Sequence, residues 1–167
     1  MMLSLVAGAV PAGDEEDAIL YFLGRLEAED PRLRFGGGAP PREPAALRRR
    51  LGLGDPRSAV LLSLDAAGAI AGMATLALAS ADMAETAVIV RSDLKRRGVG
   101  TALMGRLVRQ ARMSDLTRLM ALVLYENIPA RRLVHRLGFR QVGPVEAALQ
   151  FQLDLDKLPA GSHALGG

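Results

Sequence analysis

Two glycines that follow a strand pattern and a basic turn constrain this chain more than any other feature. Residues 88–101 read VIVRSDLKRRGVGT: an apolar run, then a turn that ends in three consecutive basic residues, then Gly98 and Gly100. Helical spacing of apolar residues starts directly afterwards and runs from Leu103 to Ala111. Glycines at a helix start let an anionic ligand approach main-chain N–H groups that have no partner within the helix. The segment therefore predicts a pyrophosphate cradle, with an ordinary glycine-rich turn and solvated basic residues as the alternative.

Two other phosphate-binding motifs do not fit this segment. The third glycine of a dinucleotide GxGxxG motif would fall at Leu103, and no Gly-Lys-Ser/Thr triplet occurs in the chain. The sequence thus favours neither a nicotinamide dinucleotide nor a P-loop nucleotide.

The rest of the chain alternates between strand and helix patterns. Its 167 residues suit one domain, which we expect over 1–158, followed by a flexible tail over 159–167. Residues 36–41, with three glycines and two prolines, predict a mobile loop. Strands are expected at 3–6, 58–64, 70–78, 86–90, 119–124, 139–142 and 148–153, and helices at 14–29, 43–51, from 98 onward, and after a capping Asn127 up to Gly138.

Composition removes several classes of function. The chain has no cysteine and only two histidines, so neither a thiol nucleophile nor a metal site is expected. Its longest uncharged stretch, 66–81, is too short to span a bilayer. The whole chain has six aromatic residues and no tryptophan, so it offers no stacking platform for nucleic acid. The opening residues lack the basic region of a signal peptide, so we expect a cytoplasmic protein.

The charge is unevenly divided along the chain. The net charge is only +3, but residues 1–84 carry 8 basic and 11 acidic side chains, whereas residues 85–167 carry 13 and 7. Any anion that the protein handles should therefore be handled by the second half. The acidity of the first half would suit an incoming amine.

Residues 88–101 resemble motif A of the GNAT superfamily of N-acetyltransferases, (Arg/Gln)-x-x-Gly-x-(Gly/Ala), with Lys95 at the Arg/Gln position. A second segment, 126–139, is similar to the family's Asn-x-x-Ala…Leu-Gly-Phe stretch. Residues 84–90, 126–129 and 32–35 further resemble the bacterial protein-lysine acetyltransferase (Pat) branch. The resemblance implies an α/β fold: a mixed, mostly antiparallel central sheet with helices on both faces and strands splayed where acetyl-CoA binds.

The resemblance also implies roles for individual residues. Glu85 matches the catalytic glutamate of the Pat branch and would act as general base, directly or through a water molecule. A backbone N–H near Val90 would receive the thioester carbonyl as negative charge develops on it. The implied acetyl-CoA-binding residues are Val88, Ile89, Val90, Lys95, Arg96, Arg97, Gly98, Val99, Gly100, Thr101 and Asn127.

The group that protonates the departing thiolate is left open. Many superfamily members have a tyrosine seven residues after the asparagine, but this chain has Val134 there, and the missing tyrosine again resembles the Pat branch. Tyr125, His135 and solvent remain as candidates, although Tyr125 could equally be a packing residue and His135 a surface residue. A run of three arginines, 48–50, is expected to be a solvated helix face, with contact to an acidic substrate as the alternative.

The expected reaction is direct transfer of acetyl from acetyl-CoA to a primary amine, without a covalent enzyme intermediate. A protein lysine is the first choice of acceptor because the resemblance is to Pat. A small amine or an amino-acid derivative, or a non-catalytic CoA-binding regulatory module, are the alternatives. The chain should act as a monomer or homodimer, with neither nucleic acid nor membrane as a partner.

Overall fold

The structure, a computed structural model, describes residues 4–8, 14–27, 29–34, 43–51 and 58–159. The loop predicted over 36–41 and all but the first residue of the tail predicted over 159–167 lie outside the described residues. Among the described residues, no helix has the length and apolar character that crossing a membrane requires.

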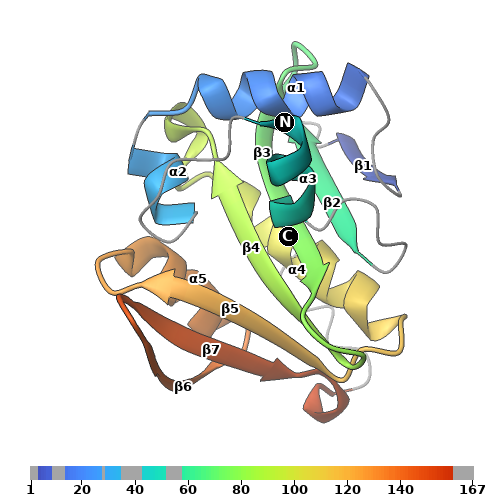
Figure 1. Ribbon diagram of the computed structural model, residues 1–167, viewed down its shortest axis with the longest axis vertical. Helices are drawn as coiled ribbons and strands as arrows, with labels where there is room; N and C mark the ends of the chain where they lie inside the picture. The colour runs from blue at the N-terminus through green and yellow to red at the C-terminus, as the bar shows by residue number, and fades with distance from the viewer. Residues whose placement is uncertain (1–3, 9–13, 28, 35–42, 52–57, 160–167) are drawn as a thin grey trace.

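A seven-stranded sheet runs through the molecule (Figure 1) in the order β1-β2-β3-β4-β5-β7-β6. β4 and β5 are parallel, and every other neighbouring pair is antiparallel. The mixed, mostly antiparallel sheet expected from the family resemblance is thereby confirmed. The strands are β1 (Ser4–Gly8), β2 (Ala59–Leu64), β3 (Ile70–Leu78), β4 (Met83–Val90), β5 (Arg118–Leu124), β6 (Arg140–Val145) and β7 (Ala148–Asp154).

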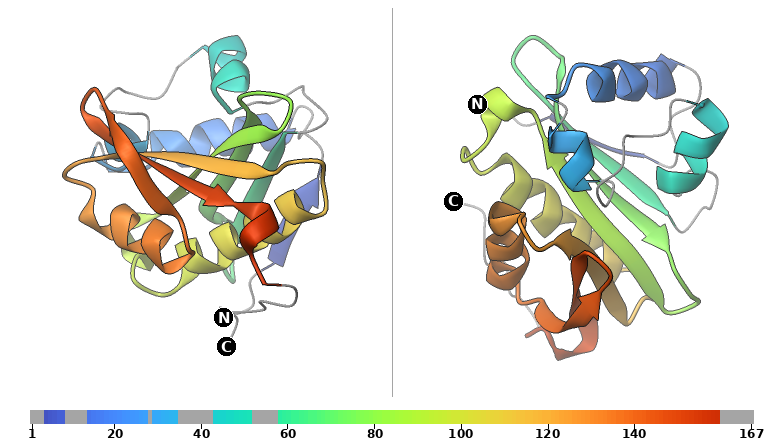
Figure 2. Two further views of the ribbon diagram at one scale, coloured as in Figure 1. Left: turned by 90° about the horizontal axis from the view of Figure 1, so that it is seen from below. Right: turned by 60° about the vertical axis from the view of Figure 1, so that its left-hand side comes forward.

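Helices cover both faces of this sheet, as Figure 2 shows. On one face, apolar residues of α1 (Asp14–Gly24) and α3 (Pro44–Leu51) form a core with alternate residues of β2, β3 and β4. On the other face, α4 (Val99–Arg112) and α5 (Ile128–Arg136) pack in a larger core that includes the fully buried Phe139 and Phe151. Successive residues of a strand point to opposite faces, so each residue of β4 belongs to one core only.

The helix predicted over 14–29 is wrong as a single element. The first helix ends at Gly24, and a separate helix, α2 (Glu29–Arg34), starts five residues later. Gly24 weakens a continuing helix, and Pro31 has no N–H to donate, so it is tolerated only in the first turn of a new one. The short α2 therefore takes a direction of its own and reaches the ends of β4 and β5.

β4 and β5 separate along their length. They pair only at Met83 with Arg118, Ala84 with Leu119 and Glu85 with Met120, and beyond Glu85 the two strands diverge (Figure 1). At the paired end, Asp82 accepts hydrogen bonds from Thr117 and Arg118 and holds the strands together. The two parallel strands are thus unpaired towards their carboxyl ends, a region that we call the gap, and the expected splay is confirmed.

Candidate active site

Main-chain groups of β4 face this gap. The N–H of Arg91 donates to the carbonyl oxygen of Ala71 (2.9 Å), and the β3–β4 register continues without a shift. In an antiparallel ladder the hydrogen-bonding direction alternates, so the odd-numbered residues of β4 bond to β3. The N–H groups of Val88 and Val90 therefore point the other way, beyond the last pair with β5. Both residues are half-buried, and a donor in such a position needs an acceptor from water or a ligand.

The three apolar residues at the end of β4 differ in what their side chains do. Ile89 is buried in the core beneath α1 and α3, whereas Val88 and Val90 pack against the core that contains α4 and α5. Packing of the side chains and exposure of the main chain to a ligand are compatible at these positions. The sequence reasoning predicted both for residues 88–90.

The predicted cradle has open donors at the start of α4. Gly98 is the residue before the helix, has φ +83°, and has no side chain that could accept a hydrogen bond from the first turn. The first bond within the helix runs from the N–H of Ala102 to the carbonyl oxygen of Gly98 (2.9 Å), so the N–H groups of Val99, Gly100 and Thr101 precede it. These groups and the helix dipole favour an anion at this end.

The start of α4 lies beside both the gap and α5. An added Cβ atom at Gly100 would lie 3.5 Å from a methyl group of Val90 and 3.7 Å from one of Leu133. The open N–H groups of α4 and the N–H groups of Val88 and Val90 therefore border one region. A ligand with an anionic part and a long polar arm could contact both sets.

The three predicted basic residues of the turn have different surroundings. Arg96 and Arg97 are exposed, and Arg96 adopts a left-handed φ of +60°. The ammonium of Lys95 instead forms an ion pair with the buried carboxylate of Asp30 in α2. Lys95 thus ties α2 to the cradle, a contact that the sequence reasoning did not anticipate.

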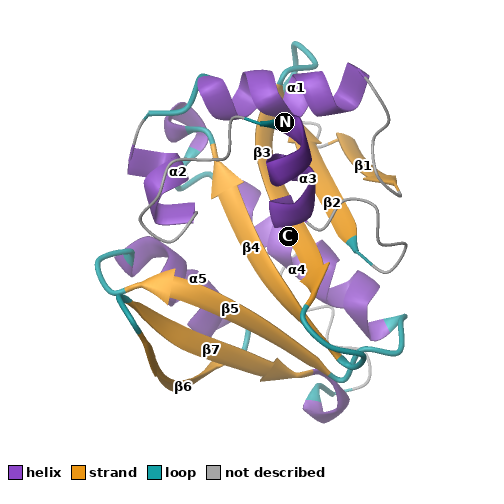
Figure 3. Cartoon of the chain, in the orientation of Figure 1, coloured by secondary structure: helices purple, strands orange, loops and turns teal. Residues whose placement is uncertain are grey.

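Helix α2 spans the open end of the gap, as Figure 3 shows beside the arrowhead of β4. Asp30 also accepts a hydrogen bond from Ser92, in the turn after β4. Arg32 donates to Glu126, after β5, with an Nη1–Oε1 distance of 3.0 Å. The two ends that diverge are therefore connected through one short helix, which we call the α2 bridge.

Glu85 lies on the face of the sheet that carries α1, α2 and α3. Its side chain is 25% exposed, and its Oε1 lies 3.6 Å from Nη1 of Arg50 in α3. Arg34 of α2 donates to the buried Thr75 (2.6 Å), which lies on the neighbouring strand. Burial, reinforced by the charge of Arg50, lowers the pKa of Arg34 to about 10, so this guanidinium is still cationic at neutral pH.

The surroundings of Glu85 differ from the acidity expected for the first half of the chain. That expectation came from a net count over 84 residues, whereas the groups closest to Glu85 are set by tertiary contacts. In the arginine face predicted to be solvated at 48–50, Arg49 and Arg50 are exposed, and Arg50 also reaches Glu85. Arg34 is not a site residue predicted from the sequence, and Arg50 is one only through the alternative of contact between 48–50 and an acidic substrate.

The end of β5 places the remaining predicted residues. Asn127 caps α5 by accepting a hydrogen bond from the N–H of Ala130 (3.1 Å), which confirms the predicted cap. Tyr125 directly follows β5 and is 44% exposed. Val134 is buried in the core, and the ring of His135 packs edge-on against Phe151, with 5.1 Å between ring centres. Both side chains considered as proton donors, Tyr125 and His135, are exposed, and of the two it is Tyr125 that lies at the end of a diverging strand.

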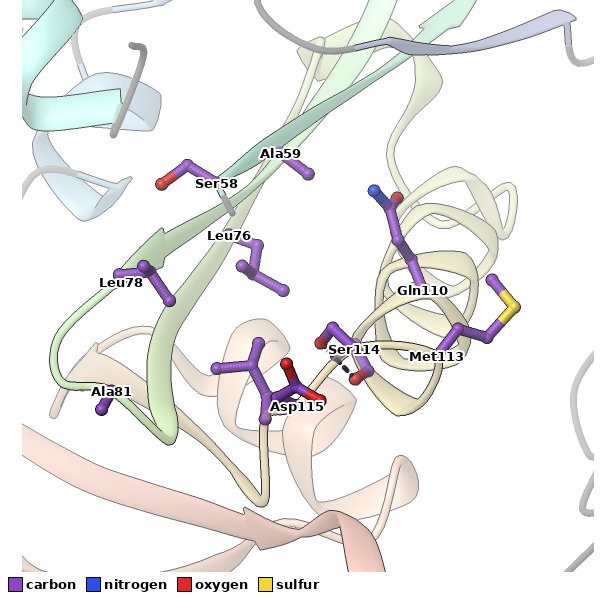
Figure 4. A pocket seen from close by; sticks show the side chains of 11 residues that line it. Ser58, Ala59, Leu76, Leu78, Ala81, Gln110, Met113, Ser114 and Asp115 are labelled. Carbon is purple, nitrogen blue, oxygen red and sulfur yellow. Dashed lines mark hydrogen bonds between the residues drawn. The ribbon is translucent and has the colours of Figure 1, made fainter. Parts of the chain in front are cut away.

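A metal centre or a separate pocket would be a rival to this site. Within the described ranges, no three His, Cys, Asp or Glu side chains come together in a way that could hold a metal ion. A pocket of about 300 Å³, bordered by Leu76, Gln110 and Asp115 among others, lies at the C-terminal end of α4 (Figure 4). It is at the opposite end of that helix from the cradle, so the predicted chemistry does not map onto it.

Comparison with known proteins shows which family the chain belongs to. The model of the acetyltransferase (GNAT) family matches residues 23–139. The curated protein acetyltransferase Pat of Mycolicibacterium smegmatis is 41% identical over 59 residues, which are 35% of this chain and 18% of that relative. The matched part is thus less than a fifth of the length of that protein.

Solved structures show the same fold at low sequence identity. The GNAT domain of S. lividans PAT has a TM-score of 0.78 at 21% identity, covering 91% of this chain and 90% of that one. Spermidine N-acetyltransferase from Vibrio cholerae, solved with CoA and spermine, has a TM-score of 0.73 at 18% identity, with 92% and 96% covered. A phosphinothricin acetyltransferase from Sinorhizobium meliloti, solved with acetyl-CoA, has a TM-score of 0.72 at 17% identity, with 97% and 95% covered. From the family match and the shared fold, this chain belongs to the acetyltransferase (GNAT) family.

Proposed function

We propose that this chain is an acetyl-CoA-dependent N-acetyltransferase whose acceptor is the primary amine of a protein lysine. The observation that carries the proposal is the gap between β4 and β5, bordered by the N–H groups of Val88 and Val90 and by the open first turn of α4. Family membership and the relatives solved with CoA or acetyl-CoA support the choice of co-substrate. The local similarity to acetyltransferase Pat supports a lysine as acceptor.

In this proposal the N–H groups of Val99, Gly100 and Thr101 bind the pyrophosphate, with Arg96 and Arg97 supplying exposed charge nearby. Val88, Ile89 and Val90 present main chain to the extended arm, and the N–H of Val90 stabilises charge on the thioester oxygen. Asn127 orients the start of α5 through its cap and lies at the edge of the same gap. The Lys95 ammonium, through its ion pair with Asp30, fixes the loop between β4 and α4.

Glu85 is proposed as the general base. A lysine has a pKa of about 10.4, so losing its proton at pH 7 costs roughly 4–5 kcal/mol, and a carboxylate that accepts this proton is useful. The amine nitrogen then forms a bond to the acetyl carbon as the carbon–sulfur bond breaks. The ammonium loses two protons: Glu85 takes one before the attack and passes it to solvent, and the second leaves as the amide forms. The thiolate takes one proton from Tyr125 or from solvent, and the second proton lost by the amine replaces it.

The substitution Glu85→Gln tests this assignment. We expect it to keep acetyl-CoA affinity within about twofold and to lower turnover by about a hundredfold or more across the pH range. Asp115→Asn, an exposed carboxylate at the far end of α4, is the matched control and should behave as the parent. Parental turnover in Glu85→Gln would remove Glu85 from the mechanism.

The acceptor class is tested separately with radiolabelled acetyl-CoA in a cell lysate. A labelled protein band that appears with the parent and disappears with Glu85→Gln supports a lysine acceptor. Label found only in small molecules would move the acceptor to a free amine, and no transfer to any amine would favour a CoA-binding module without catalysis.

A further inference from the structure

Two guanidinium groups surround the carboxylate that the proposed function uses as its base. Arg50 lies 3.6 Å from Glu85, and Arg34 is close enough that both Arg50 and Glu85 act on its pKa. Glu85 therefore has two cationic side chains near it on the acceptor face of the sheet. Arg34 is fixed there because its Nη2 donates to Thr75 and its Nε and Nη1 atoms are buried.

This charge distribution disfavours a strongly cationic acceptor. An acceptor ammonium that approaches Glu85 must come within reach of Arg50, which lies 3.6 Å from Glu85 and is 40% exposed. Further positive charges on the same acceptor would be repelled, because charges a few ångströms apart in a partly buried site are only partly screened. A carboxylate close to the ammonium would be attracted, and a guanidinium suits a carboxylate in charge and shape.

We propose that the acceptor lysine lies beside an acidic residue, and that Arg50 binds this carboxylate while Glu85 receives the lysine ammonium. The inference rests on the proposed function, since it takes the same face of the sheet as the acceptor site. Substrate binding then exchanges one ion pair for two: Arg50 with the acceptor's carboxylate, and Glu85 with the acceptor's ammonium. Arg34 stays in place on Thr75 as a second cation near the site.

The inference assigns selection of the acceptor to Arg50 and gives no such role to Arg49. Arg49 is exposed on the same helix. The ion pair with Glu85 is formed by Arg50. Arg49 therefore provides a control with the same charge, the same helix and an adjacent position.

The test uses three peptides, each with a blocked amino terminus and a single lysine, flanked on both sides by two glutamates, two glutamines or two arginines. For the parent we expect kcat/KM to be about tenfold higher for the glutamate peptide than for the glutamine peptide, and lowest for the arginine peptide. Arg50→Gln should reduce the first ratio to about two or less, and Arg50→Glu should reverse the order. Arg49→Gln should keep the parental order.

Ratios between peptides are the readout because removing Arg50 also changes the surroundings of Glu85, which affects all three peptides alike. Thermal unfolding of each variant checks that the half-exposed substitutions leave the fold intact. Equal rates on the three peptides, or an unchanged preference in Arg50→Glu, would overturn the inference while leaving the proposed function standing. Failure to acetylate any of the three, with acetyl-CoA bound normally, would count against the lysine acceptor and against this inference with it.

Discussion

The carboxylate of Asp30 in α2 forms an ion pair with the ammonium of Lys95 in the loop that leads into α4. Asp30 is only 5% exposed, and its second oxygen accepts a hydrogen bond from Ser92. One buried carboxylate thus fixes two points of the loop between β4 and the open turn of α4. The shape of the proposed pyrophosphate site therefore depends on a helix that precedes it by more than 60 residues.

The substitution Asp30→Asn should loosen this loop. Removing one partner of a buried ion pair lowers the free energy of unfolding by about 3–5 kcal/mol. Because Lys95 is itself 46% exposed, we expect a loss of about 1–3 kcal/mol here. We expect acetyl-CoA affinity, measured by titration calorimetry, to fall about tenfold, with a smaller change in kcat at saturation. Asp154→Asn, which breaks an exposed pair with Lys157, is the control.

The opposite outcome for Asp30→Asn is informative. If Lys95 contacted phosphate directly, releasing it from Asp30 would tighten acetyl-CoA binding. Tighter binding would therefore contradict a positioning role for Asp30, and restoration of affinity by Asp30→Glu would support it.

The two glycines of the cradle should respond differently to alanine. Gly98 has φ +83°, and an L-residue there costs about 1–2 kcal/mol even though the space around it is open. At Gly100 the added methyl group makes ordinary contacts with Val90 and Leu133, and φ is not in the left-handed region. We expect Gly98→Ala to lower acetyl-CoA affinity at least about tenfold and Gly100→Ala to change it less than about threefold, by calorimetry. Similar effects of the two substitutions on acetyl-CoA affinity would contradict the claim that binding depends on the left-handed turn at Gly98.

Local patterns were predictable from the sequence because their causes lie within a few residues. The turn at 65–68 forms with Asp65 accepting from the N–H groups of Ala67 and Ala69, and Gly68 takes φ +79°. The cap at Asn127 and the end of α5 before Gly138 follow from equally short spacings. The strand, turn and helix start of residues 88–101 were predictable for the same reason, since they too depend on residues close together in the sequence.

Contacts that join distant parts of the chain could not be predicted in this way. Arg34 meets Thr75 across 41 residues, Asp30 meets Lys95 across 65, and Arg32 meets Glu126 across 94. No periodicity encodes such pairs, since they exist only once the sheet has brought its strands together. The same limit explains why α2 was merged with α1: the helical spacing continues past Gly24, whereas the contacts that redirect the chain are tertiary.

The α2 bridge should open when its outer contact is removed. Arg32 donates to both Glu29 and Glu126, and these bonds raise its pKa further above its ordinary value, so it is cationic at every pH of interest. In Arg32→Met we expect backbone amides of residues 29–34 and of the start of α5 to exchange hydrogen severalfold faster, with the strands unchanged. Arg25→Met, which removes an exposed contact with Tyr21 in α1, is the control. Exchange that rises in α2 alone would show that the bridge does not couple the two strand ends.

The closed end of the gap should confer a pH-dependent part of the stability. Hydrogen bonds from Arg118, Ser80 and Thr117, in that order of effect, lower the pKa of Asp82 from its ordinary 3.8 to about 2. Because the folded pKa lies below the unfolded one, the contribution of Asp82 to stability is complete above about pH 4 to 5 and is lost as the pH falls through about 2.

Urea unfolding of the parent and of Asp82→Asn, measured between pH 2 and 8, checks this expectation. The parent should be more stable than the variant by a constant amount at neutral pH, and the difference should shrink below about pH 4 and vanish near pH 2. Other carboxylates with lowered pKa values titrate alike in both proteins, so the difference between the two curves isolates Asp82. A difference that persists undiminished at the acidic end would mean that Asp82 holds β4 to β5 through neutral hydrogen bonds rather than through its charge.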